Sequence, residues 1–283
     1  MPELPEVETI IRRLRAGEPM DENSEAFPTP IGRTIRSAWG NWPNSIRPSI
    51  KFIAKDLPGH CIQSINRRGK YIVFQLFAAK PDAVHYLIIH LKMSGRLEVR
   101  KKGEPRHKHV HFSCRLDNEY FLDFNDARKF GRVHYVEDAA TFLQNLGPEP
   151  LAPQFTLRVF RKMIEGKTGR LKGLLLDQTF VAGLGNIYTD ESLWRAKVHP
   201  CTRANQLTRQ DVARLHKAIT NSLRAGIRHN GAAIDWVYPA GGYQRFFRVY
   251  ARTGRACSRC GASITKILVG QRGTHFCPVC QPF

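Results

Sequence analysis

Four cysteines close to the C-terminus constrain the fold of this 283-residue chain more than any other feature. They form two C-x-x-C pairs, Cys257 with Cys260 and Cys277 with Cys280, with 16 residues between the pairs. This spacing is typical of zinc sites in which each pair supplies two thiolates to one tetrahedral ion. Disulfides are the weaker alternative, because we expect no signal sequence from the acidic residues that open the chain. Four thiolates leave zinc no open position, so we predict one structural zinc ion.

The charge of the chain predicts a polyanionic partner. Its 44 Lys and Arg residues outnumber 24 Asp and Glu residues, which gives a net charge of +20, more than solubility requires. No acidic residue occurs from 236 to 283, where Arg and Lys alternate with Tyr and Phe. Nucleic acid is therefore the favoured partner, with an anionic membrane surface as the weaker alternative. No apolar run approaches the roughly 20 residues of a membrane span.

Apolar periodicity divides the chain into a β-rich and a helical part. Residues 3–15 carry Val7, Ile10, Ile11 and Leu14 at helical spacing. Short β-rich runs follow, and they indicate a sandwich or barrel-like domain: 34–39, 61–65, 71–77, 85–91, 109–116, 120–123 and 132–136. A Gly- and Pro-rich stretch at 147–153 is the expected boundary. Helices are expected after it at 157–166, 171–178, 186–196 and 208–230, and a metal-bound hairpin at 264–276.

A turn before the helix expected at 186 contains Gly183 and Gly185. Its backbone N–H groups and the helix N-terminus could bind a phosphate, with the Asn186 side chain as a further donor. A Gly-x-Gly pair by itself is more often a plain turn. The zinc pattern beside it makes the nucleic-acid interpretation more specific.

Four motifs in the same order along the whole chain resemble bacterial formamidopyrimidine-DNA glycosylase. These are Pro2-Glu-Leu-Pro-Glu-Val-Glu8, Asp126-Ala-Arg-Lys-Phe-Gly131, Gly183-Leu-Gly-Asn-Ile-Tyr188 and Gln271-Arg-Gly-Thr-His-Phe-Cys-Pro-Val-Cys-Gln281. The resemblance implies an α+β multidomain protein: a β-sandwich flanked by helices, then a helix-two-turn-helix domain with a zinc-finger hairpin. It implies excision of oxidised purines, such as 8-oxoguanine and formamidopyrimidines, followed by cleavage of the DNA strand.

The family's organisation implies boundaries and partners for this chain. We expect a catalytic domain with the N-terminal helix at 1–146, a linker at 147–156, a helix-two-turn-helix domain at 157–243 and the zinc hairpin at 244–283. The expected partner is damaged double-stranded DNA, and no membrane partner is expected. We expect a monomer in the bacterial cytoplasm, associated with the nucleoid while it acts.

The implied catalytic residues are Pro2, Glu3 and Lys70. After removal of Met1, the secondary amine of Pro2 would be a nucleophile, because α-amino groups titrate far below lysine. Glu3 suits general acid-base chemistry, such as protonation of the sugar ring oxygen. Lys70 matches a lysine that contacts the phosphate of the lesion. Without the resemblance, a helix start and a solvated lysine would be the plain interpretations.

Six further residues match the family's DNA-binding positions. Glu6 is implied to orient the flipped nucleotide, and Asn186 and Arg272 to bind phosphates around it. Extrusion of a base leaves a hole in the stack, which Met93, Arg128 and Phe130 are implied to fill. His107, His109 and His111 alternate as metal ligands can, yet the family has none there, so we expect structural or phosphate-facing roles.

Two segments depart from the family pattern, and two alternatives remain open. The loop at 17–30 is long, and Asp21, Glu22 and Glu25 are not expected to touch DNA. The segment at 232–243 lacks the usual Ser-Asp-Gly loop that closes over the base, which leaves the ranking of lesions open. A relative acting on oxidised pyrimidines is the first alternative. A non-catalytic zinc DNA-binding protein is the second, although pure binding needs neither Pro2 nor Glu3.

Overall fold

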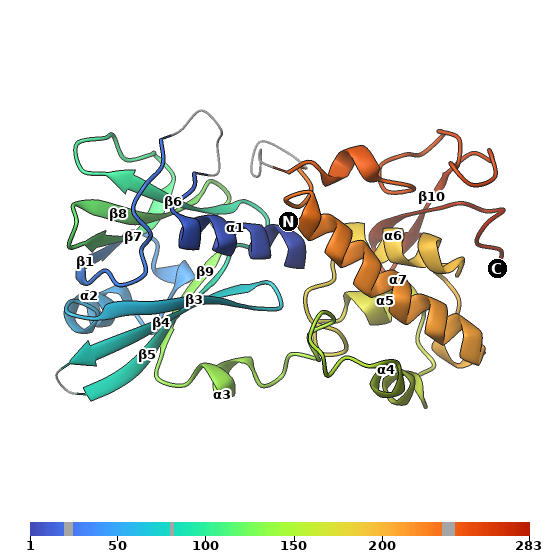
Figure 1. Ribbon diagram of the computed structural model, residues 1–283, viewed down its shortest axis with the longest axis horizontal. Coiled ribbons are helices and arrows are strands. Elements are labelled where there is room, and N and C mark those ends of the chain that lie inside the picture. The colour runs from blue at the N-terminus through green and yellow to red at the C-terminus, as the bar shows by residue number, and fades with distance from the viewer. Residues whose placement is uncertain (20–24, 80–81, 234–240) are drawn as a thin grey trace. The chain divides into compact units, whose positions relative to one another are not determined.

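The computed structural model describes residues 1–19, 25–79, 82–233 and 241–283, which fold into two compact units (Figure 1). Unit 1 consists mainly of Glu6–Gln144, with Met1–Pro2. Unit 2 consists mainly of Asn145–Ala232 and Gly242–Phe283, and it also includes Glu3–Pro5. The start of the chain is therefore divided between the units, so that Glu3 packs among residues more than a hundred positions away in sequence.

Unit 1 is built from two β-sheets around one apolar core. The four-stranded sheet has the order β1-β7-β8-β6, and the five-stranded sheet has the order β2-β9-β5-β4-β3. Apart from the parallel β2–β9 pair, the strand pairs are antiparallel. The strands are β1 Ile35–Gly40, β2 Ile46–Arg47, β3 Cys61–Arg68, β4 Tyr71–Ala79, β5 Asp82–His90, β6 Gly95–Lys101, β7 Val110–Leu116, β8 Tyr120–Asp126 and β9 Arg132–Val136.

The N-terminal helix α1 spans Leu4–Ala16. Val7, Ile10, Ile11 and Leu14 are all buried in the core of unit 1, as their helical spacing predicts. Glu6 in the first turn and Arg13 and Arg15 in the last turn each lie where the helix dipole favours their charge.

Unit 1 also contains elements that the sequence patterns do not reveal. Helix α2, Ile50–Asp56, begins at the N-cap Ser49 and buries only Ile53, so its apolar period is too short to detect. The short helix α3, Ala139–Leu143, has no fully buried side chain, and its Phe142 and Leu143 are only half-buried. Strand β6 was not among the predicted runs, although Leu97 and Val99 alternate there with charged residues in the period-two pattern of a half-buried strand.

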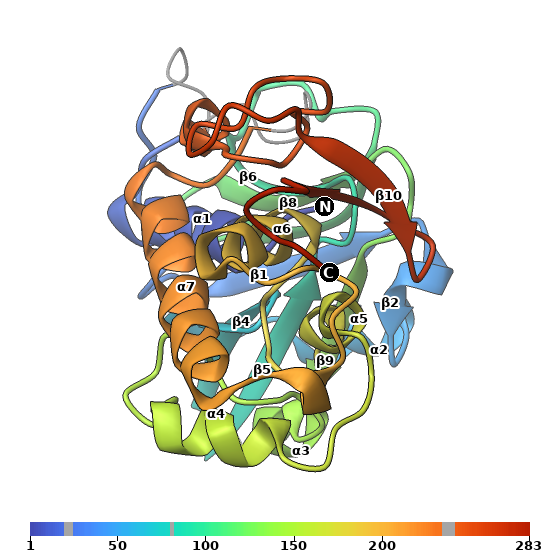
Figure 2. The ribbon, with the colours of Figure 1, turned by 90° about the vertical axis from the view of Figure 1, so that its right-hand side faces the viewer.

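Unit 2 is helical and ends in a β-hairpin. Its helices are α4 Leu157–Ile164, α5 Leu171–Leu176, α6 Asn186–Ala196 and α7 Arg209–Arg228, and the hairpin strands are β10 Thr265–Val269 and β11 Arg272–Phe276. Helix α7 packs along α6 (Figures 1 and 2), and α6 also contacts β11. The predicted α+β class with a helical second half and a C-terminal hairpin is confirmed.

Helix α6 occupies the centre of unit 2. Every residue from Ile187 to Trp194 is buried, including the consecutive acids Asp190 and Glu191. A helix that is buried on all sides must satisfy its polar groups within the protein. None of the helices in the described part of the chain has the length and apolar composition needed to cross a bilayer.

Candidate active site and metal centre

The carboxylate of Glu3 lies on the N-terminus of α6. Its oxygens accept hydrogen bonds from the backbone N–H groups of Gly185 at 2.7 Å, Ile187 at 2.9 Å and Tyr188 at 3.3 Å. The side chain is only 2% exposed. A helix N-terminus with several free N–H groups is a natural site for an anion. Here that anion is a carboxylate of the protein itself.

Two glycines allow this close approach. A Cβ on Gly185 would lie 2.3 Å from the carboxyl carbon of Glu3, which is inside any normal contact distance. Gly183 has a positive φ of +91°, and a Cβ there would lie 2.7 Å from the Cβ of Leu4. The backbone N–H of Leu4 also donates to the carbonyl of Gly183. Glycine at both positions is therefore needed to place Glu3.

The prediction that this turn provides backbone donors for a phosphate is wrong. The N–H of Gly183 donates to the side chain of Gln178, and the N–H groups of Gly185, Ile187 and Tyr188 donate to Glu3. The turn does bind an anion, but that anion is the carboxylate of Glu3 and not a phosphate. The sequence did not show that the ligand comes from the other end of the chain.

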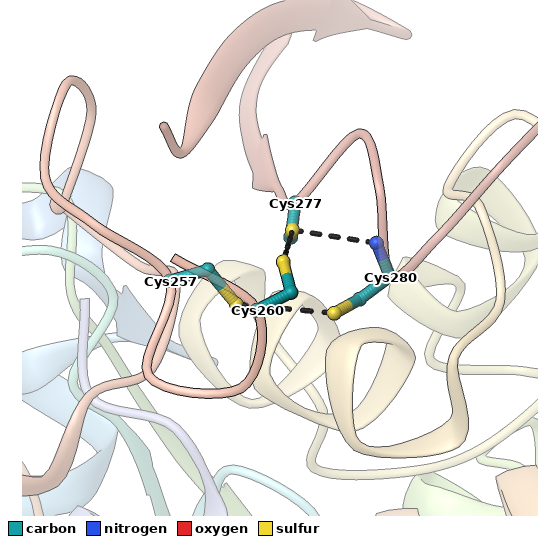
Figure 3. A group of neighbouring side chains, drawn as sticks. All are labelled: Cys257, Cys260, Cys277 and Cys280. Atoms are coloured by element: carbon teal, nitrogen blue, oxygen red, sulfur yellow. Dashed lines mark hydrogen bonds between the residues drawn. The ribbon is translucent and has the colours of Figure 1, made fainter. Parts of the chain in front are cut away.

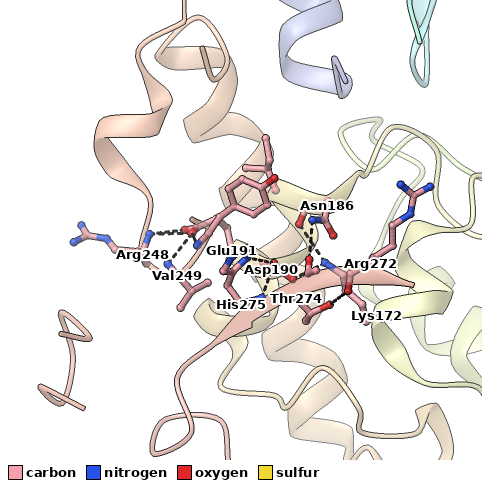
Figure 4. Close-up of polar contacts among 12 residues, drawn as sticks. Lys172, Asn186, Asp190, Glu191, Arg248, Val249, Arg272, Thr274 and His275 are labelled. Atoms are coloured by element: carbon pink, nitrogen blue, oxygen red, sulfur yellow. Dashed lines mark hydrogen bonds and ion pairs between the residues drawn. The ribbon is translucent and has the colours of Figure 1, made fainter. Parts of the chain in front are cut away.

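Asp190 connects α6 to the hairpin and to a buried lysine (Figure 4). One carboxylate oxygen accepts from Lys172 Nζ at 2.5 Å, and the other accepts from the N–H of His275 at 2.9 Å. The side chains of Lys172 and Asp190 are both fully buried. Burial lowers the pKa of Lys172, and the charge of Asp190 opposes that shift. A buried pair of this kind costs several kcal/mol when one partner is removed.

Glu191 fixes the segment that enters the zinc region. Its fully buried carboxylate accepts from the N–H groups of Arg248, Val249 and Tyr250 at 2.9–3.1 Å (Figure 4). Burial raises the pKa of Glu191, and the three donors oppose the shift. Two consecutive acids of α6 therefore hold two different stretches of the C-terminal region.

Asn186 and Arg272 lie on neighbouring elements of unit 2. Asn186 Nδ2 donates to the carbonyl of Gly273 at 2.9 Å, so the first turn of α6 is joined to β11. Arg272 is the first residue of β11, and its exposed side chain extends away from the contacts of Asp190 (Figure 4). The amide of Asn186 orients the hairpin in this structure, while the guanidinium of Arg272 is available to an outside anion.

The four predicted zinc ligands meet at the base of the hairpin (Figure 3). Their sulfur atoms all lie within 4.8 Å of one another, with Cys260 and Cys277 at 3.4 Å and Cys257 and Cys280 at 4.0 Å. Tetrahedral zinc with Zn–S bonds of about 2.3 Å separates its sulfurs by about 3.8 Å, so the cluster fits the ion. Backbone N–H groups of Arg259 and Cys280 point at Cys257 and Cys277, which favours thiolates. The chain carries one structural zinc at this site.

Zinc loss is expected to unfold the hairpin, because folding of such a small element depends on the metal. A Cys257→Ser variant should contain clearly less than one zinc per chain and should lose DNA binding, while the circular dichroism of the β-rich unit 1 persists. Cys201→Ser is the matched control, since Cys201 is half-buried and stands apart from the cluster. Normal zinc content in Cys257→Ser would contradict the ligand assignment.

In unit 1, strand register gathers the other candidate residues at one edge. Tyr71 at the start of β4 pairs with His90 at the end of β5, and His90 pairs with Arg132 at the start of β9. The turns that carry Lys70, Met93 and Phe130 therefore lie at the same end of the five-stranded sheet. These residues are distant in sequence, and the antiparallel register alone brings their turns together.

Asp126 ties together the two turns that carry the expected base-stack fillers. This buried carboxylate accepts from the hydroxyl of Ser94, from the N–H of Arg128 at 3.3 Å and from the N–H of Gly131 at 2.6 Å. Ser94 directly follows Met93, so one side chain orders both turns. Neither Asp126 nor Ser94 was predicted as a functional residue, although Asp126 is the first residue of the motif at 126–131.

The three expected fillers are all exposed, although two of them, Met93 and Phe130, are apolar. Met93 and Phe130 are each 44% exposed, whereas such side chains in β-rich domains are usually in the core. The guanidinium of Arg128 lies 4.9 Å from the centre of the Phe130 ring, a cation–π geometry. An exposed thioether and a guanidinium stacked on an aromatic ring form a surface suited to contact with bases.

Pro2, Glu6 and Lys70 are buried in unit 1. Lys70 lies in the tight turn between β3 and β4, beside Gly69 with its φ of +56°, and is 5% exposed. Burial, together with the charges of Lys92 and Lys70, lowers the pKa of His90 to about 3. The neutral His90 accepts from the N–H of Lys92 at 2.9 Å and so holds the turn before Met93.

The histidines at 107, 109 and 111 make hydrogen bonds within the protein. His111 Nδ1 donates to Asn41 at 2.8 Å, and the imidazole of His107 accepts from the N–H of His109. Among the described residues, these three histidines do not form a metal-capable group. Residues 234–240 of the departing segment at 232–243, and Asp21 and Glu22 of the loop at 17–30, lie outside the described residues.

Three family models match the chain in the order of its parts. Residues 1–133 match the formamidopyrimidine-DNA glycosylase N-terminal domain, and 146–237 match the H2TH domain of the same enzyme. Residues 254–282 match a zinc finger found in FPG and IleRS.

Similar proteins match over their full length. The formamidopyrimidine-DNA glycosylase of Protochlamydia amoebophila is 38% identical, with 99% of each chain covered, and that of Chloroflexus aurantiacus is 40% identical, with 99% of this chain and 98% of the relative covered. A solved MutM in complex with DNA containing carbocyclic 8-oxo-G superimposes with a TM-score of 0.89 at 38% identity, with 100% of both chains covered. Lactococcus lactis Fpg in complex with DNA containing N7-benzyl-Fapy-dG gives 0.88 at 38%, also with full coverage. By sequence and by structure, the chain belongs to the formamidopyrimidine-DNA glycosylase family.

Proposed function

We propose that this chain excises oxidised purines from double-stranded DNA and then cleaves the strand at the resulting abasic site. The observation that carries the proposal is the carboxylate of Glu3, directly after Pro2 in the chain and held by three N–H donors. These hydrogen bonds hold an acid next to the proposed nucleophile, where base excision requires one and DNA binding alone does not. The similar MutM and Fpg structures contain 8-oxo-G and Fapy-dG derivatives in DNA, which supports purine lesions as the substrate class.

Pro2 is the proposed nucleophile. After removal of Met1, the lone pair of its secondary amine attacks C1′ of the damaged nucleotide, and the base leaves with the electron pair of the broken bond and takes a proton from water. The resulting iminium withdraws electrons from the sugar and makes its protons acidic. Elimination of the 3′ and then the 5′ phosphate follows, so one covalent intermediate serves both steps.

Glu3, Glu6 and Lys70 complete the proposed catalytic group. Glu3 takes up the proton that the Pro2 nitrogen loses when it bonds to C1′ and passes it to the sugar ring oxygen. The bond between C1′ and the ring oxygen then breaks as the iminium forms, and the N–H donors keep the carboxyl group in place. Lys70 supplies a positive charge for the phosphate of the lesion, and Glu6 orients the extruded nucleotide. Because Lys70 is buried in a tight turn, its ammonium group is ordered before DNA binds.

Unit 2 supplies the proposed phosphate contacts. Arg272 on β11 and Asn186 on α6 are joined through Gly273, so the zinc-bound hairpin and α6 would act on the backbone together. We propose that 1–146 forms the catalytic domain, 157–243 the helix-two-turn-helix domain and 244–283 the zinc finger, with 147–156 as the linker. The net charge of +20 favours a polyanionic partner, and the DNA bound in the similar MutM and Fpg structures supports DNA as that partner.

We further propose a monomer that acts on chromosomal DNA in the bacterial cytoplasm. All of the proposed nucleophile, acid, filler and phosphate-binding residues come from a single chain. A second subunit is therefore not needed to complete the site.

A direct test compares incision of duplexes that differ in one base. Duplexes with 8-oxoguanine and formamidopyrimidine should be cut, and undamaged duplex should not. Thymine glycol separates the purine assignment from the alternative relative that acts on oxidised pyrimidines. Faster cleavage at thymine glycol than at both purine lesions would overturn the substrate assignment, and no cleavage of any lesion would favour a pure binding protein.

Arg128→Ala and Phe130→Ala should harm base excision more than cleavage at a preformed abasic site. Extrusion of a paired, stacked base costs a few kcal/mol, which filler residues offset, and an abasic site has no base to extrude. We expect the rate of excision to fall by about tenfold or more, with a much smaller effect on the abasic duplex. The matched control is Arg115→Ala, an exposed arginine of β7 outside these turns. Equal losses on both substrates would assign the two residues to folding.

A further inference from the structure

Four polar side chains converge in unit 1 away from the proposed active-site residues. Asp56 ends α2, His60 follows in the next turn, and His85 and Tyr135 lie on β5 and β9. His60 Nε2 lies 3.1 Å from His85 Nδ1 and 3.2 Å from the phenol oxygen of Tyr135. One ligand atom from each of Asp56, His60 and His85 lies within 4.8 Å of the others.

The cluster has too few N–H and O–H protons to make a hydrogen bond at each of its close contacts. His60 Nδ1 lies 3.1 Å from the carbonyl of Leu57, which can only accept, so this nitrogen carries the proton of a neutral ring. Tyr135 donates its single hydroxyl proton to Asp56 at 2.5 Å. The lone pair of His60 Nε2 therefore faces a phenol oxygen that has no proton left to offer. A proton on His85 Nδ1 can fill one contact of His60 Nε2 but not both.

The arrangement matches what a divalent metal ion requires. Two imidazole nitrogens on tetrahedral zinc, with bonds of about 2.05 Å, lie about 3.3 Å apart, close to the 3.1 Å found here. Histidine ligands commonly donate their second ring N–H to a backbone carbonyl, and His60 does so to Leu57. A metal ion would bind the lone pairs of His60 Nε2 and His85 Nδ1, which face one another here.

The ligands are also fixed before any ion arrives. His60 is 4% exposed, and its backbone is held by contacts of its N–H with Leu57 and of its carbonyl with Ile35. His85 is held by its register opposite Leu76. Asp56 is exposed and gives an ion access from solvent. Little reorganisation would be needed for binding.

We propose that Asp56, His60 and His85 form a second metal site that takes a divalent ion of the zinc type. The fourth position is left to water or to the oxygen of Tyr135. Nitrogen and oxygen ligands suit Zn²⁺, Ni²⁺ or Cu²⁺. With two imidazoles and one carboxylate in place of four thiolates, the site binds zinc more weakly than the cysteine site and fills only when metal is supplied. A bound ion would link α2 to β5 and stabilise unit 1.

Metal analysis tests the stoichiometry. Protein that retains its cysteine-bound zinc is dialysed against micromolar Zn²⁺, and we expect two zinc ions per chain. His85→Gln should hold one, because glutamine keeps hydrogen bonding and removes the imidazole ligand. His107→Gln, which alters an exposed histidine with a histidine neighbour, should still hold two. One zinc in the wild type, or two in His85→Gln, overturns the proposal.

Ring-nitrogen NMR identifies the ligands without relying on a variant that has to fold. In protein labelled with ¹⁵N-histidine, Zn²⁺ should shift the resonances of His60 and His85 with saturation at one added equivalent. His107 and His216, which lie elsewhere, should not shift. Unchanged signals of His60 and His85 would mean that the cluster is a hydrogen-bonded network only.

Discussion

Glu3→Gln is expected to lower the rate of base excision by at least about a hundredfold, because general acid-base groups contribute factors of roughly 10² to 10⁴. An amide cannot protonate the sugar ring oxygen while the base is still attached. Cleavage at a preformed abasic site should be retained in part, because the sugar there already opens without loss of a base. The measurement is single-turnover kinetics on 8-oxoguanine and abasic duplexes.

The structure predicts that Glu3→Gln also lowers the stability of the fold. Both oxygens of Glu3 accept from backbone N–H groups, so the NH₂ of glutamine must face at least one donor. We expect the free energy of unfolding to fall by about 1–3 kcal/mol. Gly185→Ala is an informative companion, since its Cβ would displace the carboxylate without changing its chemistry. Wild-type excision in Glu3→Gln, with DNA binding intact, would exclude Glu3 as the acid.

Extension of the N-terminus by one residue before Pro2 should abolish both base excision and strand cleavage. The extension turns the amine into an amide, whose nitrogen has no basic lone pair to attack C1′. Affinity for lesion DNA should persist within a few fold, because the zinc hairpin and Arg272 are unchanged. Excision and binding are measured on the same preparation.

The control is to restore the free amine of Pro2 in the same extended protein. A removable N-terminal segment that ends directly before Pro2 is cleaved by a protease, which frees the amine without any other change. Activity should return in proportion to the cleaved fraction. An extended protein that excises as well as the cleaved one would mean that another residue is the nucleophile.

The sequence predicted those features whose signals are local. The apolar period of α1, the alternating strands of the sandwich and the C-x-x-C pairs each depend on neighbouring residues, and all three are present as expected. The weak helix α2 buries only Ile53, so its pattern carried too little information. Strand β6 was not predicted, although Leu97 and Val99 alternate with charged residues there.

The interior of unit 2 could not be predicted in the same way. No sequence pattern marks Asp190 and Glu191 as buried. Both are buried because their hydrogen-bond partners, Lys172, His275 and residues 248–250, come from distant segments of the chain. The anion at the N-terminus of α6 was predicted as a phosphate and is Glu3. Such contacts depend on the tertiary fold, which motif spacing does not encode.

Reduction of the enzyme–DNA intermediate with borohydride, followed by mass spectrometry of the linked peptide, tests the central claim most directly. The iminium formed between the enzyme and C1′ becomes a permanent secondary or tertiary amine on reduction. The account predicts that the sugar remnant is attached to the nitrogen of Pro2, in protein that has lost Met1. Attachment to Lys70 or any other lysine would contradict the mechanism, even if the protein excised 8-oxoguanine at full rate.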